Sequence, residues 1–128
     1  MLFRSELLSE RGVLDPRFVG VHCTNLLPHE ARLLGEARGF ACVCPTTERD
    51  LGDGLPDVGA LRAAGVALST GVDSHVQTDP FEDLRGVELG ERLRTQRRVT
   101  ERAHARPAAA LWHMASHAGA REIGRAHV

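Results

Sequence analysis

The sequence predicts an α/β fold, specifically a partial (β/α) barrel of the TIM type. Short apolar runs alternate with helix-like segments, and three of these runs end in polar residues. The polar ends are His22, the segment that starts at Cys44, and Asp73. Because side chains at the carboxyl ends of parallel strands converge on one mouth of a barrel, this pattern points to an enzyme site.

The length of the chain limits how much of a barrel it can form. A complete eight-stranded barrel typically needs about 250 residues, and this chain has 128. It can supply roughly three strand–helix units. We therefore expect residues 1–128 to be a single incomplete barrel segment with at least one unpaired strand edge.

The first half of the chain predicts two strands separated by a helix. Residues 6–12 resemble the end of a helix, and a turn then leads into the apolar run 18–21, which suits a buried parallel strand. Pro28 begins a helix that Gly39 ends. The apolar run 40–44 follows directly, and we expect it to form the second strand.

The second half predicts a third strand among helices. Glycine and proline interrupt residues 45–56, which predicts a loop. A short helix over 58–64 and a strand over 66–69 follow, and a long amphipathic helix begins at Pro80. The last predicted helix covers about residues 107–118. This alternation favours a right-handed parallel arrangement.

Composition excludes several classes of protein. The hydrophobic fraction is 42% and the formal net charge is −1, so the sequence predicts neither a nucleic-acid nor a membrane partner. The three cysteines, Cys23, Cys42 and Cys44, are odd in number and lie in or beside apolar runs, which argues against a secreted disulfide framework and favours a reducing cytoplasm. We expect them to be small core residues rather than a thiolate site.

The two ends of the chain differ in character from the rest. Residues 1–5 and 122–128 resemble translations of a short-read sequencing adapter read in opposite senses. On that interpretation the genuine segment covers about residues 6–121 and His127 is no ligand. The alternative is that these are ordinary terminal residues.

The most specific stretch of the sequence is residues 44–54, which read CPTTERDLGDG. Together with His22 and the Asp73-Ser74 turn, it resembles the amidohydrolase superfamily and, within it, the formimidoylglutamate deiminases, zinc enzymes of histidine breakdown. The resemblance extends over nearly all of residues 6–121 and implies that the three strands are roughly strands six to eight of the barrel. Asn25 departs from it, because these deiminases commonly carry a second histidine there.

The resemblance also implies roles for individual residues. Asp73 would ligate zinc, take the proton of the attacking water and pass it to the leaving ammonia. His22 would hydrogen-bond the attacking oxygen or the developing tetrahedral centre. Thr46, Thr47 and Glu48 would line the substrate mouth. The family takes its remaining zinc ligands from other strands, so we expect this chain alone to be inactive and to bind metal weakly at best.

The function implied by the resemblance is the conversion of N-formimino-L-glutamate and water to N-formyl-L-glutamate and ammonia, with zinc as cofactor, in a cytoplasmic parent enzyme that forms a homodimer. Two alternatives remain open. Another amidohydrolase, such as a guanine deaminase-like aminohydrolase, would share His22 and Asp73 but should lack the run at 44–54. A non-catalytic α/β module would make the polar strand ends coincidental.

Two further histidines have a spacing that could suit a metal ion, but the rest of the motif is absent. His113 and His117 are four residues apart on a predicted helix, but the glutamate of the zinc-protease motif is missing and Met114 follows His113. We expect both histidines to be surface or packing residues.

Overall fold

A computed structural model describes residues 4–74, 78–98 and 106–125. Its centre is a parallel sheet of three strands, β1 (Val19–Val21), β2 (Phe40–Val43) and β3 (Ala67–Thr70), in the order β1-β2-β3. Each strand pairs with its successor, with Val19 opposite Phe40 and Phe40 opposite Ala67. The prediction of a mixed α/β segment with parallel strands is confirmed, and one edge of β1 is unpaired among the described residues.

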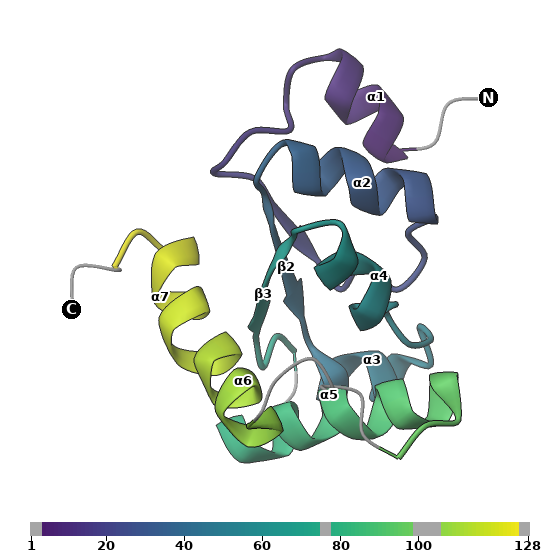
Figure 1. Cartoon of the computed structure of the whole chain (residues 1–128), viewed down its shortest axis with the longest axis vertical. Coiled ribbons are helices and arrows are strands. Elements are labelled where there is room, and N and C mark those ends of the chain that lie inside the picture. The colour runs from purple at the N-terminus through teal and green to yellow at the C-terminus, as the bar shows by residue number, and fades with distance from the viewer. Residues whose placement is uncertain (1–3, 75–77, 99–105, 126–128) are drawn as a thin grey trace.

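Helices connect the strands and surround the sheet (Figure 1). They are α1 (Arg4–Glu10), α2 (Pro28–Glu36), α3 (Pro45–Leu51), α4 (Val58–Ala63), α5 (Pro80–Thr95), α6 (Pro107–His113), a π-helical segment over Met114–Ala118, and α7 (Gly119–Glu122). Proline occupies the first turn of four of them, where its missing N–H has no helical partner to lose. The strands and most helices lie within one or two residues of the predicted bounds.

Two sequence predictions need correction. Residues 45–56 are not a loop throughout, because α3 occupies the first seven of them and ends at Gly52, whose φ of 69° is left-handed. The helical run predicted for 107–118 is interrupted by the π-helical segment and then continues through α7. The first stretch has no regular apolar period, whereas the second keeps a helical period in Leu111, Met114 and Ala118.

The core lies on the face of the sheet that carries Ala41 and Val43, both fully buried. Leu34, Leu61 and Leu84 of α2, α4 and α5 belong to the same apolar cluster. In Figure 1, α2 and α4 lie on one side of the sheet and the α6–α7 run on the other. The helices that follow each strand therefore cover the sheet from outside, as in a barrel.

The C-terminal helical run contacts the opposite face of the sheet. The Arg121 guanidinium lies over the Phe40 ring, 6.0 Å from its centroid, and the Ser69 hydroxyl donates a hydrogen bond to Glu122. Phe40 and Ser69 share a face because side chains alternate along paired strands. This run thus covers part of the face that points into a closed barrel.

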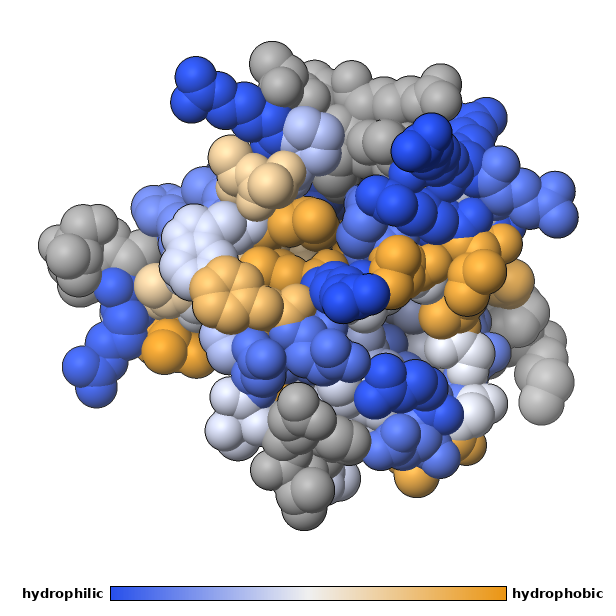
Figure 2. Space-filling view, turned by 90° about the horizontal axis from the view of Figure 1, so that it is seen from below, coloured by the Kyte–Doolittle hydropathy of each residue, from blue (hydrophilic) through white to orange (hydrophobic). Residues whose placement is uncertain are grey.

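The lower face of the molecule, where α5 lies in Figure 1, exposes apolar side chains between charged ones (Figure 2). Leu84 and Val87 of α5 are buried, whereas Phe81 and Leu93 are 66% and 77% exposed. The Phe81 ring stacks on Trp112 with centroids 5.4 Å apart. Within the described ranges, the helices are too short or too polar to cross a membrane.

Candidate functional site at the carboxyl ends of the strands

The polar residues predicted to converge do lie together at one edge of the sheet. His22 and Cys44 follow β1 and β2 directly, and Asp73 comes shortly after β3. The strand pairing extends into this edge, since His22 N donates to Cys42 O at 2.8 Å and Gly71 N donates to Val43 O at 3.1 Å. The sheet register therefore sets the spacing of the three side chains.

His22 and Asp73 approach each other closely, with His22 Nε2 3.5 Å from Asp73 Oδ2. The Cys44 thiol lies beside them, so that ligand atoms of all three residues are within 4.8 Å of one another. Cys44 is buried, whereas about a third of each of the other two side chains is exposed. The group is thus anchored in the core and open on the solvent side.

The donor types of this group suit a zinc ion, although its three ligand atoms, which are up to 4.8 Å apart, spread wider than a tetrahedral zinc would hold them. Zinc accepts nitrogen, sulfur and oxygen donors at about 2.0 to 2.3 Å in a tetrahedral arrangement, which places the donor atoms about 3.4 Å apart. The 3.5 Å between His22 and Asp73 agrees with that spacing. Among the residues that the structure describes, these are the three potential metal ligands that lie close enough together to share one ion.

Glu48 lies behind His22 on α3. Its side chain is 2% exposed, and its Oε1 accepts a hydrogen bond from Cys44 N at 2.7 Å. The same oxygen is 3.4 Å from His22 Nδ1. Burial raises the pKa of Glu48, although the hydrogen bonds from Cys44 N and His22 act in the opposite direction. The His22 ring is therefore held between two carboxylates, Glu48 on one side and Asp73 on the other.

Thr46 and Thr47 are buried, and both hydroxyls are engaged within the protein. Thr46 Oγ1 donates to Asp83 Oδ1 of α5 at 3.1 Å, and Thr47 Oγ1 donates to the Val72 carbonyl at 2.9 Å. These bonds fasten α3 to α5 and to the segment that precedes Asp73. The predicted part of these residues in substrate binding stays a prediction.

Two of the thiols at this edge, those of Cys44 and Cys23, have raised pKa values. The hydrogen bond with Cys42 and burial raise the pKa of the Cys44 thiol. Burial, with the Glu48 carboxylate nearby, raises the pKa of Cys23 to about 12. A metal ion that used Cys44 would have to displace its proton, as coordinated metals do.

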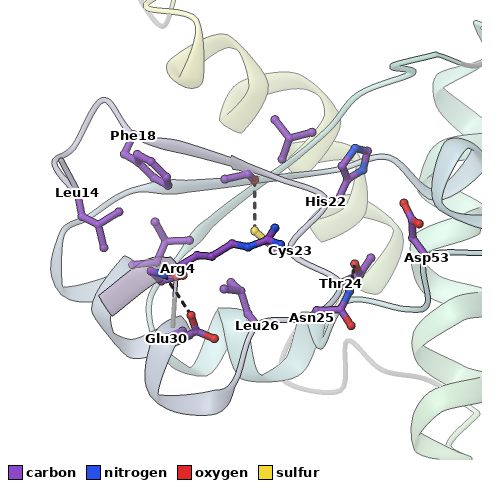
Figure 3. A pocket seen from close by; sticks show the side chains of 14 residues that line it. Arg4, Leu14, Phe18, His22, Cys23, Thr24, Asn25, Leu26, Glu30 and Asp53 are labelled. Atoms are coloured by element: carbon purple, nitrogen blue, oxygen red, sulfur yellow. Dashed lines mark hydrogen bonds between the residues drawn. The ribbon is translucent and has the colours of Figure 1, made fainter. Parts of the chain in front are cut away.

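A cavity of about 640 Å³ runs from this edge along the unpaired side of β1 (Figure 3). His22 and Asp53 lie at one end of it, and Leu14 and Phe18 at the other (Figure 3). Asn25, where the sequence departs from the deiminase pattern, also lines the cavity and donates to Thr24 Oγ1 at 3.1 Å.

Three site residues have an uncommon backbone conformation. His22, Cys23 and Asp73 have φ angles of 68°, 55° and 55°. In this left-handed region, non-glycine residues are a small minority and are concentrated at functional sites. His75, which the sequence places next to this edge, lies outside the described residues.

The other histidine pair has a different setting. The rings of His113 and His117 lie 4.8 Å apart between centroids, tilted by 38°, on the exposed side of the C-terminal helical run. Neither belongs to the metal-ligating group at the strand ends.

Several curated proteins are similar to this chain in sequence, whereas no family model matches it. A formimidoylglutamate deiminase of Pseudomonas aeruginosa is 37% identical over 91 residues, which cover 71% of this chain and 20% of the relative. A 5'-deoxyadenosine deaminase of Methanothrix thermoacetophila is 31% identical over 114 residues, which cover 87% and 26%. The chain thus spans about a fifth to a quarter of the length of these relatives.

Several solved structures are similar in fold. An amidohydrolase from Brucella melitensis superposes with a TM-score of 0.85 at 28% identity, covering 95% of this chain and 28% of that one. An adenosine deaminase from Xanthomonas campestris with bound zinc superposes with a TM-score of 0.81 at 25% identity, covering 94% and 27%.

Proposed function

We propose that this chain, which corresponds to one segment of an amidohydrolase-superfamily deaminase, contributes His22 and Asp73 to a zinc site in a protein that hydrolyses N-formimino-L-glutamate. The observation that carries the proposal is the 3.5 Å approach of His22 Nε2 to Asp73 Oδ2 where the strands end. On this proposal, the three strands are roughly strands six to eight of a complete barrel, and residues 1–128 form one incomplete domain.

The reaction adds water to the amidine carbon of the substrate and releases ammonia, so that an N-formyl group replaces the N-formimino group. Asp73 would accept the proton that the water loses and deliver it to the departing nitrogen. His22 would donate a hydrogen bond to the oxygen that becomes the formyl oxygen. The partial exposure of both side chains gives the substrate access to them.

Zinc suits this chemistry because a water bound to it has a pKa of about 7, so that a nucleophile is present at neutral pH. Asp73 would supply an oxygen donor to zinc, while His22, 3.5 Å away, would keep its hydrogen bond for the reacting oxygen. The zinc bound in the Xanthomonas campestris structure, which has a similar fold, supports a metal in the parent protein.

Similarity favours the formimidoylglutamate substrate over others. The match to the Pseudomonas aeruginosa deiminase is 37% identical, against 31% for the 5'-deoxyadenosine deaminase. Residues 44–54, the most specific part of the family resemblance, form α3 and its caps. Glu48 of this run contacts His22. Thr46, Thr47 and Glu48 would then bind substrate or hold the residues that do.

A second candidate is the hydrolytic deamination of a purine nucleoside or base. It is favoured by the match to the 5'-deoxyadenosine deaminase, which covers 87% of this chain against 71% for the deiminase. His22 and Asp73 would keep the same roles on an aromatic amidine carbon. The two candidates differ in the substrate and not in the geometry of this edge.

The chain by itself is proposed to be inactive, because the remaining ligands of the family come from strands that it does not include. The assignment of residues 1–5 and 122–128 to adapter sequence, the cytoplasmic location and the homodimeric parent enzyme also remain proposals.

The test uses the protein that contains this segment, recovered by long-read sequencing across the locus and expressed with zinc. Ammonia release is measured with N-formimino-L-glutamate, 5'-deoxyadenosine and guanine in parallel. We expect turnover of the first substrate and its loss in D73N. Turnover of a purine alone would support the second candidate, and no turnover of any of the three would overturn both.

A further inference from the structure

We propose that His113 and His117 form a second metal site, which binds a divalent late transition-metal ion such as Ni²⁺, Cu²⁺ or Zn²⁺ through one nitrogen of each imidazole. The site is separate from the group at the strand ends, because neither histidine belongs to that group. The proposal does not rest on the proposed function, since both ligands are described residues of this chain.

The helical run that carries the two histidines fixes the direction in which they point. His113 is the last residue of α6, and His117 lies in the π-helical segment that follows. Met114 and Ala118, each one residue further along, are buried at 2% and 6% exposure. Residues four apart on a helix share a face, so the core anchors one face of this run while both histidines lie on its exposed side. π-helical turns of this kind are rare and are frequently found at functional sites.

The separation of the two rings suits a shared ion. Their centroids are 4.8 Å apart and their planes are tilted by 38°. A metal ion about 2.0 to 2.1 Å from a nitrogen of each ring lies roughly 3.2 Å from each ring centre. The two centres are then about 4.5 to 5.3 Å apart for the ligand angles of about 90° to 109° in octahedral and tetrahedral ions. The observed separation lies within this range, so the pair can take up an ion without a shift of the backbone.

The nitrogens of both rings are available to a ligand. Among the described residues, the two rings contact each other, and neither takes part in a hydrogen bond or an ion pair. The setting of His22 differs, because it lies between two carboxylates, and so does that of His29, which is 3.0 Å from Glu6. An ion at the exposed pair would therefore replace water at the two rings, and water would complete its coordination.

The donor set decides the class of ion. Two neutral imidazoles suit Zn²⁺, Cu²⁺ and Ni²⁺, whereas Mg²⁺ and Ca²⁺ prefer oxygen ligands. Two histidines four apart on one helix face are also the spacing by which the zinc-protease helix holds its metal. The glutamate of that motif, which is missing here, is the general base and not a ligand. Its absence argues against hydrolysis by this pair and has no bearing on binding.

The experiment is a titration of the full 128-residue chain with NiCl₂ at about pH 8, where a free imidazole is neutral and does not compete as an acid. Nickel is paramagnetic, so it broadens the NMR signals of rings that lie next to it. We expect the ring-proton signals of His113 and His117 to broaden together, at lower nickel concentrations than the signal of His29. An excess of EDTA should restore them.

Substitutions test whether the two rings act as a pair. H113Q and H117Q should each weaken nickel binding at the remaining ring about tenfold, because the second imidazole of a pair binds at the high effective concentration that the helix sets. H29Q, which removes a histidine on another helix, and D73N, which alters the strand ends, are the controls and should leave the affinity unchanged. The double variant H113Q/H117Q removes this pair from zinc measurements at the strand ends.

Broadening of the His29 signal at the same nickel concentrations as the pair would overturn the proposal, because it would show binding to any exposed imidazole. A loss of about twofold or less in both H113Q and H117Q would also overturn it, since each ring would then bind an ion by itself. The titration of the unmodified chain decides alone if a variant does not fold. Failure of the ammonia assay would leave the result standing, because nickel binding involves no turnover.

Discussion

Two buried glutamates, Glu30 and Glu48, occupy similar places and differ in what completes their hydrogen bonding. Both accept a backbone N–H at the start of a helix. The two oxygens of Glu30 accept from separate backbone groups, Leu27 N and Ser5 N, and these bonds outweigh the opposing effect of burial and lower its pKa. Glu48 gives one oxygen to Cys44 N and His22, and burial raises its pKa.

The difference in hydrogen-bond partners indicates that the carboxylate of Glu30 stabilises the fold, whereas that of Glu48 supports the candidate functional site. Backbone donors are always present and cannot titrate, so Glu30 is a structural cap. The partner of Glu48 is an imidazole that faces a possible metal position. A buried acid with a titratable neighbour in an open cleft is a better indicator of function than burial or charge alone.

The largest expected effect concerns the thiols beside Glu48. Since the pKa of Cys23 is raised to about 12, its alkylation by iodoacetamide in the folded chain at about pH 8 should be on the order of a thousandfold slower than in urea. Peptide mass spectrometry measures both rates. Cys42, whose pKa is lowered by its hydrogen bond with Cys44, is the internal control and should react before Cys23. Equal rates in the folded and unfolded chain would show that folding does not desolvate the Cys23 thiol.

A smaller effect should separate the two glutamates in metal binding. E48A should weaken zinc binding by the chain about tenfold, because Glu48 contacts both His22 and the backbone of Cys44 in the candidate metal group. E30A should change it by less than the experimental error. Competition with a chromophoric zinc chelator measures the affinities, with D73A as the reference for loss of a ligand. Equal losses in E48A and E30A would mean that the effect is on folding.

The smallest effect is on stability, and the two glutamates should differ in sign. The lowered pKa of Glu30 means that its charge stabilises the fold above the unfolded value of 4.5, and that this contribution is lost as the pH falls through the folded value. E30Q should therefore lower the unfolding free energy by about 1 kcal/mol at neutral pH and less in acid.

Glu48 should behave in the opposite way. Because its folded pKa is raised, its contribution is present below the unfolded value of 4.5 and is lost as the pH rises through the folded value. E48Q should not destabilise the chain at neutral pH. Urea unfolding of both variants at several pH values measures this, and a loss of stability in E48Q equal to that in E30Q would contradict the comparison.

The sequence was sufficient to predict the strands and the residues that meet where they end. Apolar runs of four or five residues locate β1, β2 and β3, and parallel pairing then places His22 and Asp73 at one edge. The family resemblance predicts both as site residues, and the structure brings them within 3.5 Å of each other. Their chemical roles remain predictions.

The supporting residues were less predictable. Residues 45–51 have proline at the first helical turn but no apolar period, and the glycines at 52 and 54 favour a loop, so α3 was missed. Without α3, nothing in the sequence places Glu48 behind His22 or Thr47 against Val72. Such contacts depend on how a short polar helix packs, which a local pattern does not encode.

The positive φ angles of His22, Cys23 and Asp73 bear on how the protein tolerates mutation. Glycine and asparagine adopt this conformation most easily, so in a saturation library they should be the best-folding replacements at these positions. Those same replacements remove the imidazole and the carboxylate. Selection for protein abundance and selection for turnover should therefore rank the substitutions at these positions in opposite orders. The reversal can be measured by counting each variant by sequencing after each selection.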